Sequence, residues 1–208
     1  MPTPFVVLTG PLIAGALSAK LQRSASPPLI NLPRATIVVA LSLTAMFAAQ
    51  LAIPNLLPWL ERSPALIEKA QLWRAVTALF VQDGGTAGAV FNLVILLVVG
   101  VIVEQRLGPA NWSILYFGGA IITEFLALPW QPHGAGNSVA CFALAGGMIA
   151  HDAGKTRTSV QFIVRLAGLF AGLALLWMRD IHGIGFLAGI VIEMALTIQR
   201  RPGSATAA

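Results

Sequence analysis

Six long apolar stretches constrain the fold of this chain more than any other feature. They lie at about residues 36–53, 86–103, 111–128, 137–150, 160–177 and 182–198. A helix that crosses the hydrocarbon core of a bilayer needs roughly 20 predominantly apolar residues. We therefore predict an all-α polytopic membrane protein, a bundle of six transmembrane helices. A long external loop, residues 61–83, connects the first two helices.

The composition supports a membrane protein and excludes several other classes. The chain is 57% hydrophobic and only 10% charged, and its mean hydropathy is +0.81. Soluble domains carry about 25% charged residues. The single cysteine, Cys141, excludes an intrachain disulfide. No pattern indicates nucleic-acid binding, a cofactor or a metal site, so the expected partners are the lipid bilayer and other transmembrane proteins.

The basic residues predict the orientation in the membrane. With six spans, both termini lie on one side, and most lysines and arginines fall on or near that side. They are Lys20, Arg23, Arg34, Arg106, Lys155, Arg157, Arg165, Arg200 and Arg201. The opposite side has Arg62, Lys69, Arg74 and Arg179. Cytoplasmic loops are enriched in such residues, so we expect both termini to be cytoplasmic, in a plasma (inner) membrane.

The chain divides into three parts on this plan. Residues 5–17 are apolar but too few to span a bilayer, and prolines follow at 27, 28 and 33. Residues 1–33 are therefore predicted as an interfacial or loosely ordered leader and linker. Residues 34–200 form the six-helix membrane domain, and residues 201–208 form a cytoplasmic tail.

One serine and one histidine begin two of the predicted helices. Ser138 opens the fourth helix and His182 opens the sixth. Both helices run inward from the external side, so the two side chains lie at the same depth. Asn92, in the second helix, lies a turn or two below the same end. A lone serine on a helix interface more often serves packing, but a serine beside a base is a candidate nucleophile.

Four short motifs in this order resemble the rhomboid family of intramembrane serine proteases, over residues 72–189. Trp73 and Arg74 lie in the first external loop, and Glu104, Arg106 and Gly108 follow the second helix. Gly136, Asn137 and Ser138 precede Phe142, and His182 precedes Gly185 and Gly189. The resemblance implies that Ser138 is the nucleophile and His182 the general base, a dyad with no acidic member. It further implies that Asn92, Asn137 and Gly136 bind the oxyanion or substrate, and that the remaining motif residues are structural.

Two positions depart from the family pattern. The second helix of the family commonly carries a histidine that helps to stabilise the oxyanion, and Gly88 stands at that position here. The glycine that usually follows the serine is Val139, whose branched side chain is expected to hold two helices apart. Three functions follow: a rhomboid-like protease that cleaves transmembrane segments, a weak or inactive relative that binds such segments as clients, or an unrelated channel or transporter. Transport is the least favoured, since no inverted repeat is present.

Several polar residues remain inside apolar stretches and need partners. Arg165 and Glu193 lie at similar depth from the cytoplasmic ends, so we predict that they pair. Glu124 has no partner that the sequence reveals. Glu104 and Arg106 are interpreted as a structural clamp. Cys141, one turn from Ser138, is interpreted as a small core residue, and His133 and His151 fall outside the predicted site.

Overall fold

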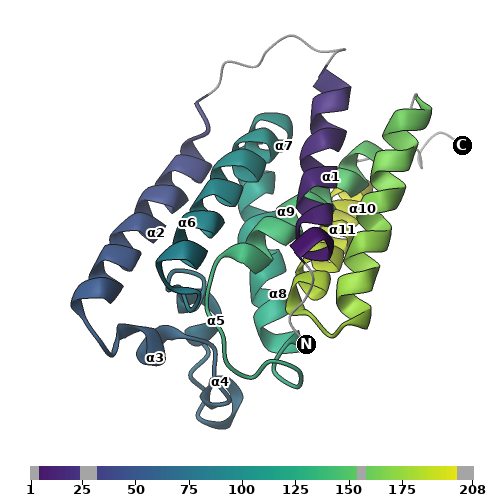
Figure 1. The fold of residues 1–208 in the computed structure, drawn as a ribbon. Coiled ribbons are helices and arrows are strands. Elements are labelled where there is room, and N and C mark those ends of the chain that lie inside the picture. Colours follow the sequence, from purple (N-terminus) through teal and green to yellow (C-terminus); the bar gives the residue numbers. More distant parts are fainter. Residues whose placement is uncertain (1–4, 24–31, 154–157, 201–208) are drawn as a thin grey trace, which may run out of the picture.

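The described residues, 5–23, 32–153 and 158–200 of a computed structural model, fold almost entirely as helices (Figure 1). The elements in chain order are α1 (Phe5–Arg23), α2 (Arg34–Ala52), α3 (Leu56–Leu60), α4 (Ala65–Glu68), α5 (Arg74–Thr77), α6 (Gly85–Ile95), the π-helical turn η1 (Leu96–Gly100), α7 (Val101–Ser113), the π-helical turn η2 (Ile114–Gly118), α8 (Gly119–Leu126), α9 (Ser138–Ala153), α10 (Ser159–Trp177) and α11 (Ile181–Gln199). Among these residues, an isolated bridge between Arg62 and Gly134 is the only β-type pairing. The all-α prediction is confirmed.

The membrane-length helices match the predicted spans closely. Four of the described helical runs are long and apolar enough to cross a membrane: Arg34–Ala52, Gly85–Leu126, Ser159–Trp177 and Ile181–Gln199. The second run joins two predicted spans through the backbone of Gly108, whose φ of 80° breaks the helix just before Pro109. An L-residue rarely adopts such a φ, so glycine is the natural residue at this turn. The shorter apolar helix α9 is the remaining predicted span.

Helix α9 lies at the centre of the bundle, and all its side chains from Val139 to Ile149 are buried. Its closest neighbour is α11, and small residues permit this approach. A Cβ atom on Gly146 would collide with the carbonyl oxygen of Phe186, and one on Gly189 would collide with that of Ala143. Glycine at both positions therefore allows the two backbones to touch.

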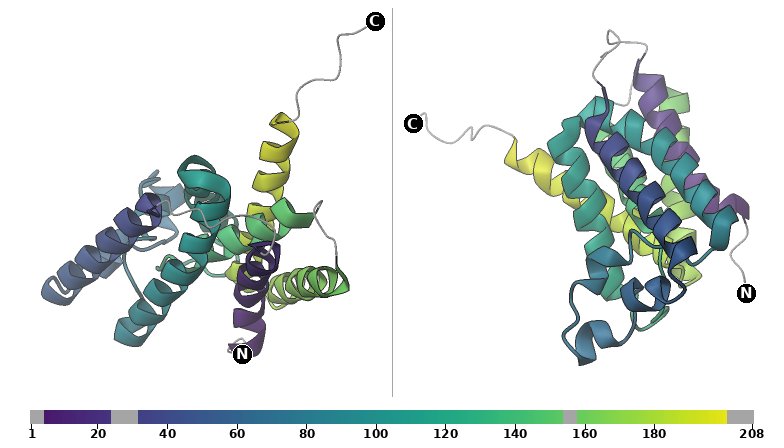
Figure 2. Two further views of the ribbon diagram at one scale, coloured as in Figure 1. Left: turned by 90° about the horizontal axis from the view of Figure 1, so that it is seen from above. Right: turned by 90° about the vertical axis from the view of Figure 1, so that its left-hand side faces the viewer.

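Helix α1 corrects the prediction of a loosely ordered leader. It packs along α9 and α10 (Figures 1 and 2). Gly15 lies so close to α9 that a Cβ there would be 2.9 Å from Ala145 Cα. The apolar run looked too short because the helix continues through Ser18, a polar residue that finds partners inside the bundle. A helix of this length covers about 28 Å at 1.5 Å per residue, close to the bilayer core.

Helix α1 adds one helix to the bundle that the six-helix prediction did not count. α1 runs from the end of the bundle that carries α3–α5 toward the opposite end, and α11 finishes at that opposite end (Figure 1). The prediction that both termini lie on one side assumed six membrane-spanning helices. With α1 in the bundle, the first and last described helices begin and end at opposite ends.

A buried polar cluster fastens α1 to the rest of the bundle at the end remote from α3–α5. Ser18 donates to Asp152 Oδ2 at 3.1 Å and accepts from Arg165 Nε at 3.2 Å. Arg106 Nη2 lies 3.4 Å from the other oxygen of Asp152. The predicted pairing of Arg165 with Glu193 is therefore wrong. Glu193 instead lies 2.8 Å from His151 and 3.3 Å from Arg200, because its face of α11 turns toward the end of α9.

Candidate active site

Ser138 and His182 meet at the N-terminal ends of α9 and α11. The Ser138 Oγ atom lies 2.8 Å from His182 Nε2, within hydrogen-bond distance. The ring of Phe142, one turn after Ser138, packs against the imidazole with a centroid separation of 4.7 Å. Val139 does not hold the helices apart, since a Cβ on Gly185 would lie 2.6 Å from its carbonyl oxygen. The expected contact between serine and histidine is therefore present.

The second imidazole nitrogen of His182 contacts a carboxylate that the sequence analysis missed. Asp180 Oδ1 lies 2.5 Å from His182 Nδ1 and also accepts the backbone N–H of His182 at 2.9 Å. Asp180 is thereby the N-cap of α11. The available signal was an aspartate directly before an apolar helix, a pattern that predicts a cap. The pattern does not predict a ring contact.

A cavity of about 140 Å³ lies over the serine and histidine. Its lining combines Ser138 and His182 with residues of the α8–α9 connection and three charged side chains, Arg62, Asp83 and Glu124. Arg62 Nη1 lies 3.0 Å from Glu124 Oε2, and both side chains are almost fully buried. Glu124, which had no partner in the sequence analysis, is thus neutralised from the external loop.

Arg62 also connects the loop of residues 61–83 to the segment before Ser138. Its backbone N–H donates to Gly134 O at 2.9 Å, and its Nε donates to Gln131 O at 2.9 Å. Asp83 Oδ2 accepts the backbone N–H of Ala135 at 2.9 Å. These contacts hold both ends of the loop 61–83 against residues 131–135. The chain that leads into Ser138 is therefore fixed from two sides.

The three residues implied as oxyanion or substrate-binding groups have different surroundings. Asn92 Nδ2 donates to Gln82 Oε1 at 2.7 Å, and Gln82 donates onward to Asn137 Oδ1 at 3.3 Å. Asn137 is fully buried and turns its own amide toward Cys141 Sγ at 3.5 Å. Asn137 thus faces the core, whereas Asn92 faces Gly136. Gln82 was missed, because nothing near it in the sequence marks it.

Gly136 has no side chain, which lets the Asn92 and Gln82 amides lie close to the backbone near Ser138. A Cβ there would lie 3.1 Å from Asn92 Nδ2, 3.4 Å from Gln82 Oε1 and 4.0 Å from Ser138 Oγ. Its φ of 134° also disfavours an L-residue. The space that a side chain would fill is therefore bounded by an amide N–H group and the serine hydroxyl.

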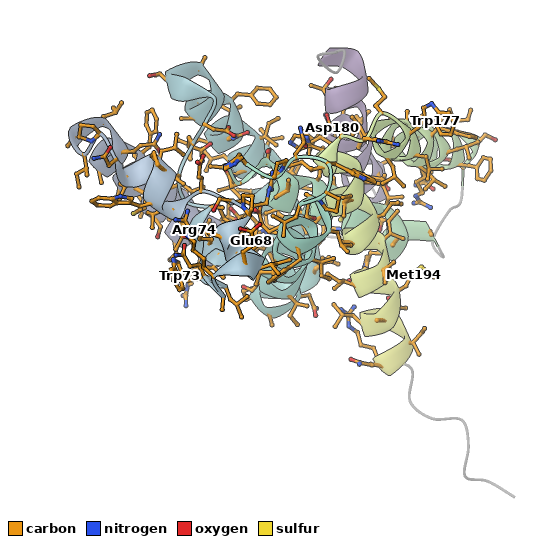
Figure 3. All side chains as sticks on the ribbon, turned by 90° about the horizontal axis from the view of Figure 1, so that it is seen from below. Glu68, Trp73, Arg74, Trp177, Asp180 and Met194 are labelled. Atoms are coloured by element: carbon orange, nitrogen blue, oxygen red, sulfur yellow. The ribbon has the colours of Figure 1, made fainter. Side chains whose placement is uncertain are left out.

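The motif residues Trp73, Arg74 and Glu104 lie away from the serine. Arg74 donates to the carbonyl oxygens of Pro58 and Glu61 at 3.0 and 2.9 Å, which braces the external loop. Figure 3 shows Trp73 and Arg74 on the α3–α5 side, well separated from Asp180. Glu104 accepts from the backbone N–H groups of Ala35 and Thr36 at 2.9 and 2.7 Å. These side chains satisfy the backbone of loops and helix ends and do not contact Ser138.

His133 lines the same cavity as Ser138, whereas His151 and Cys141 lie elsewhere. His133 is exposed and lies 3.7 Å from Glu61, and His151 is at the opposite end of α9. Cys141 is buried. Within residues 5–23, 32–153 and 158–200, no group of three or more His, Cys, Asp or Glu side chains is placed to hold a metal ion.

The fold and this site define a multi-pass integral membrane protein in which a short central helix presents a serine to a histidine on its neighbour. Comparison with known families gives the particular class. The rhomboid domain matches residues 69–200, which is more than half of the chain. The chain belongs to the rhomboid family.

One similar relative is Rhomboid-like protease 3 of Toxoplasma gondii. The two sequences are 38% identical over 82 residues, a stretch that covers 38% of this chain and 31% of the relative. The match thus spans about a third of the length of that curated relative.

Proposed function

We propose that this protein is an intramembrane serine protease that cleaves transmembrane segments of other membrane proteins. The observation that carries the proposal is the 2.8 Å contact between Ser138 Oγ and His182 Nε2. A serine hydroxyl is a weak nucleophile unless a base within this distance takes its proton. Membership of the rhomboid family supports the same activity.

The reaction follows from the two side chains. Ser138 Oγ attacks the peptide carbonyl carbon while its proton passes to His182 Nε2. The C–N bond then breaks, the amine leaves with that proton, and the acyl group remains as an ester on Ser138. A water molecule gives a proton to Nε2 and attacks the ester. The acid product leaves, and the serine hydroxyl is restored.

The negative charge of the intermediate requires hydrogen-bond donors next to Ser138. The backbone N–H groups of the first turn of α9 precede the first intrahelical bond, from Cys141 N to Asn137 O. Because Gly136 has no side chain, the Asn92 amide can approach the same region. Donors of this kind, positioned in advance, stabilise an oxyanion. We assign the backbone groups as the principal donors and Asn92 as an auxiliary one.

We also infer the orientation of the site in the membrane. Three helix ends that carry basic residues lie toward the end of the bundle away from α3–α5 (Figure 1): the end of α1 with Lys20 and Arg23, the start of α2 with Arg34, and the end of α11, which Arg200 follows. The positive-inside rule assigns this end to the cytoplasm. The site then faces the exterior of a plasma (inner) membrane, where water can reach the cavity. The start of α1 faces the exterior too, and the end of α11 faces the cytoplasm.

A direct test uses purified protein in liposomes with a transmembrane peptide that contains helix-destabilising residues. The wild type is expected to cleave the peptide and to be labelled by a fluorophosphonate at Ser138. Ser138→Ala should remain folded and lose both reactions. If the folded wild type neither cleaves nor becomes labelled, the protease proposal is wrong.

A second candidate function is the binding of transmembrane segments without cleavage. Its specific support is the absence of an oxyanion histidine at Gly88, together with the hydrogen bond that ties the Asn92 amide to Gln82. Such a protein would bind the same peptide in liposomes but leave it intact. Both functions therefore predict that the protein binds the peptide, and only the protease function predicts that the peptide is cleaved.

A further inference from the structure

We propose that Asp180 is a positioning residue that completes a Ser138–His182–Asp180 triad, in place of the dyad that the resemblance implies. The one oxygen Asp180 Oδ1 contacts both the backbone N–H and the ring Nδ1 of His182, at 2.9 and 2.5 Å. The catalytic part of this proposal rests on the proposed protease function. The hydrogen-bonding part stands on the geometry alone.

The carboxylate determines which imidazole nitrogen carries the proton. An ionised carboxylate only accepts hydrogen bonds, so a neutral His182 must hold its proton on Nδ1 to bond with Asp180. Nε2 then has a free lone pair toward Ser138 Oγ, 2.8 Å away. This is the tautomer that accepts the serine proton. Without the carboxylate, the imidazole is free to adopt the opposite tautomer, in which Nε2 is already protonated.

The same contact stabilises the charge that forms during the reaction. When Nε2 takes the proton of Ser138, the ring becomes an imidazolium, and its Nδ1–H remains bonded to Asp180. The side chains of His182 and Asp180 are only 19% and 11% exposed. Hydrogen bonds between charged groups are strong, and limited water access strengthens them. The carboxylate itself neither gains nor loses a proton in this scheme.

Asp180 is held in place by backbone contacts on both sides. Its N–H donates to Leu175 O at 2.9 Å, and its carbonyl oxygen accepts from Gly183 N at 3.1 Å. The turn between α10 and α11 places Arg179 at a φ of 56°. Phe142 packs against the imidazole from α9. The ring of His182 is therefore located by a serine, a carboxylate and an aromatic side chain from two helices.

The alternative role for Asp180 is N-capping alone, and the two roles respond differently to substitution. Asparagine and serine are good N-caps, so Asp180→Asn and Asp180→Ser should leave the thermal midpoint close to that of the wild type. Neither side chain carries a charge. In Asp180→Asn the amide is also able to donate to Nδ1, which favours the wrong tautomer.

The kinetic test compares kcat and KM for cleavage of the transmembrane peptide by the full chain. For Asp180→Asn and Asp180→Ser we expect kcat to fall by up to about 10⁴-fold with KM nearly unchanged, as for the aspartate of a serine protease triad. Thr158→Ala is the matched control, because Thr158 caps α10 and accepts from Gln161 N. It should lower the thermal midpoint and leave kcat near that of the wild type. An unchanged kcat in both Asp180 variants overturns the triad.

A spectroscopic test does not depend on activity. In ¹⁵N-histidine NMR spectra, the His182 signal is assigned by its loss in His182→Gln. The wild type should show His182 protonated at Nδ1, with a downfield proton that disappears in Asp180→Ala. If Nδ1 is unprotonated in the neutral wild-type ring, the positioning role is wrong. A wild type that is silent in cleavage and labelling but shows this signal would refute the protease function and retain the Asp180 contact.

Discussion

The two ends of α9, outer and inner in the proposed orientation, each lie beside a serine in a polar cluster, and the clusters differ in what the serine contacts. At the outer end, Ser138 bonds to the imidazole of His182 beside a cavity. At the inner end, Ser18 of α1 lies between the carboxylate of Asp152 and the guanidinium of Arg165. The two clusters are at opposite ends of one central helix.

This difference distinguishes a cluster suited to a reaction from a cluster that stabilises helix packing. At the outer end, the proposed reaction passes the serine proton to His182, which is partly exposed and lines the cavity. At the inner end, Ser18 lies between a carboxylate and a guanidinium of opposite charge, and Ser18 and Asp152 are fully buried. A hydroxyl held between a carboxylate and an arginine stabilises a helix contact and gains no reactivity. The comparison teaches that burial and hydrogen bonding alone do not identify a nucleophile.

The largest expected effect is on activity at the outer end. Ser138→Ala should lower kcat by something on the order of 10⁶-fold, because serine and base act as one unit. Ser18→Ala should leave kcat unchanged and reduce the free energy of unfolding by about 1–3 kcal/mol, the cost of leaving buried polar groups unsatisfied. Peptide cleavage in liposomes and thermal unfolding in detergent measure the two effects. Equal loss of activity in both variants would contradict the comparison.

The next effect is on stability at the inner end. Asp152→Ala should destabilise the fold by about 3–5 kcal/mol, because it leaves the arginines around it without their buried carboxylate. Ser42→Ala is a control, since its exposed hydroxyl bonds only to Val38 O within α2. Thermal unfolding compares the variants. A double-mutant cycle between Asp152 and Arg106 should also show coupling, and purely additive effects would mean that the contact is unimportant.

The third effect concerns the auxiliary oxyanion donor. Asn92→Ala should lower kcat by roughly 10²-fold and leave measurable turnover, because the backbone donors of α9 remain. An oxyanion donor can instead be added at position 88. A Cβ atom built on Gly88 has no neighbouring atom within 4 Å. Gly88→His should therefore fit and raise kcat. Complete loss of turnover in Asn92→Ala would make Asn92 the main donor.

The smallest expected effect concerns the close crossing of α9 and α11, which brings Ser138 and His182 together. Gly189→Ala should cost about 1–3 kcal/mol of stability and lower kcat, since the added methyl group forces α11 away from Ala143 of α9. Gly88→Ala is the matched control, because it adds the same methyl group in open space. Thermal unfolding and peptide cleavage measure both. If the two alanine variants behave alike, the close crossing does not position His182.

Much of this architecture could be predicted from the sequence alone. The six apolar stretches reappear as the long helices and α9, because the cost of placing polar groups in a bilayer is a local property of each stretch. The pairing of Ser138 with His182 was also accessible, since each begins a helix that runs in the same direction. When the direction of two helices and the position of a residue along each are known, the depths of the two residues in the membrane can be compared.

Only the tertiary structure decided which polar groups become partners. Arg62 neutralises Glu124 across 62 residues of chain, and Arg165 turns to Ser18 and away from Glu193. These pairings depend on how each helix is rotated about its axis, on how the helices cross, and on where α1 packs. The hydropathy of the sequence contains none of this information. The contact of Asp180 with His182 is likewise a matter of side-chain direction at one turn. Sequence determines how deep a residue lies along its own helix, whereas the packing of helices determines which way it faces.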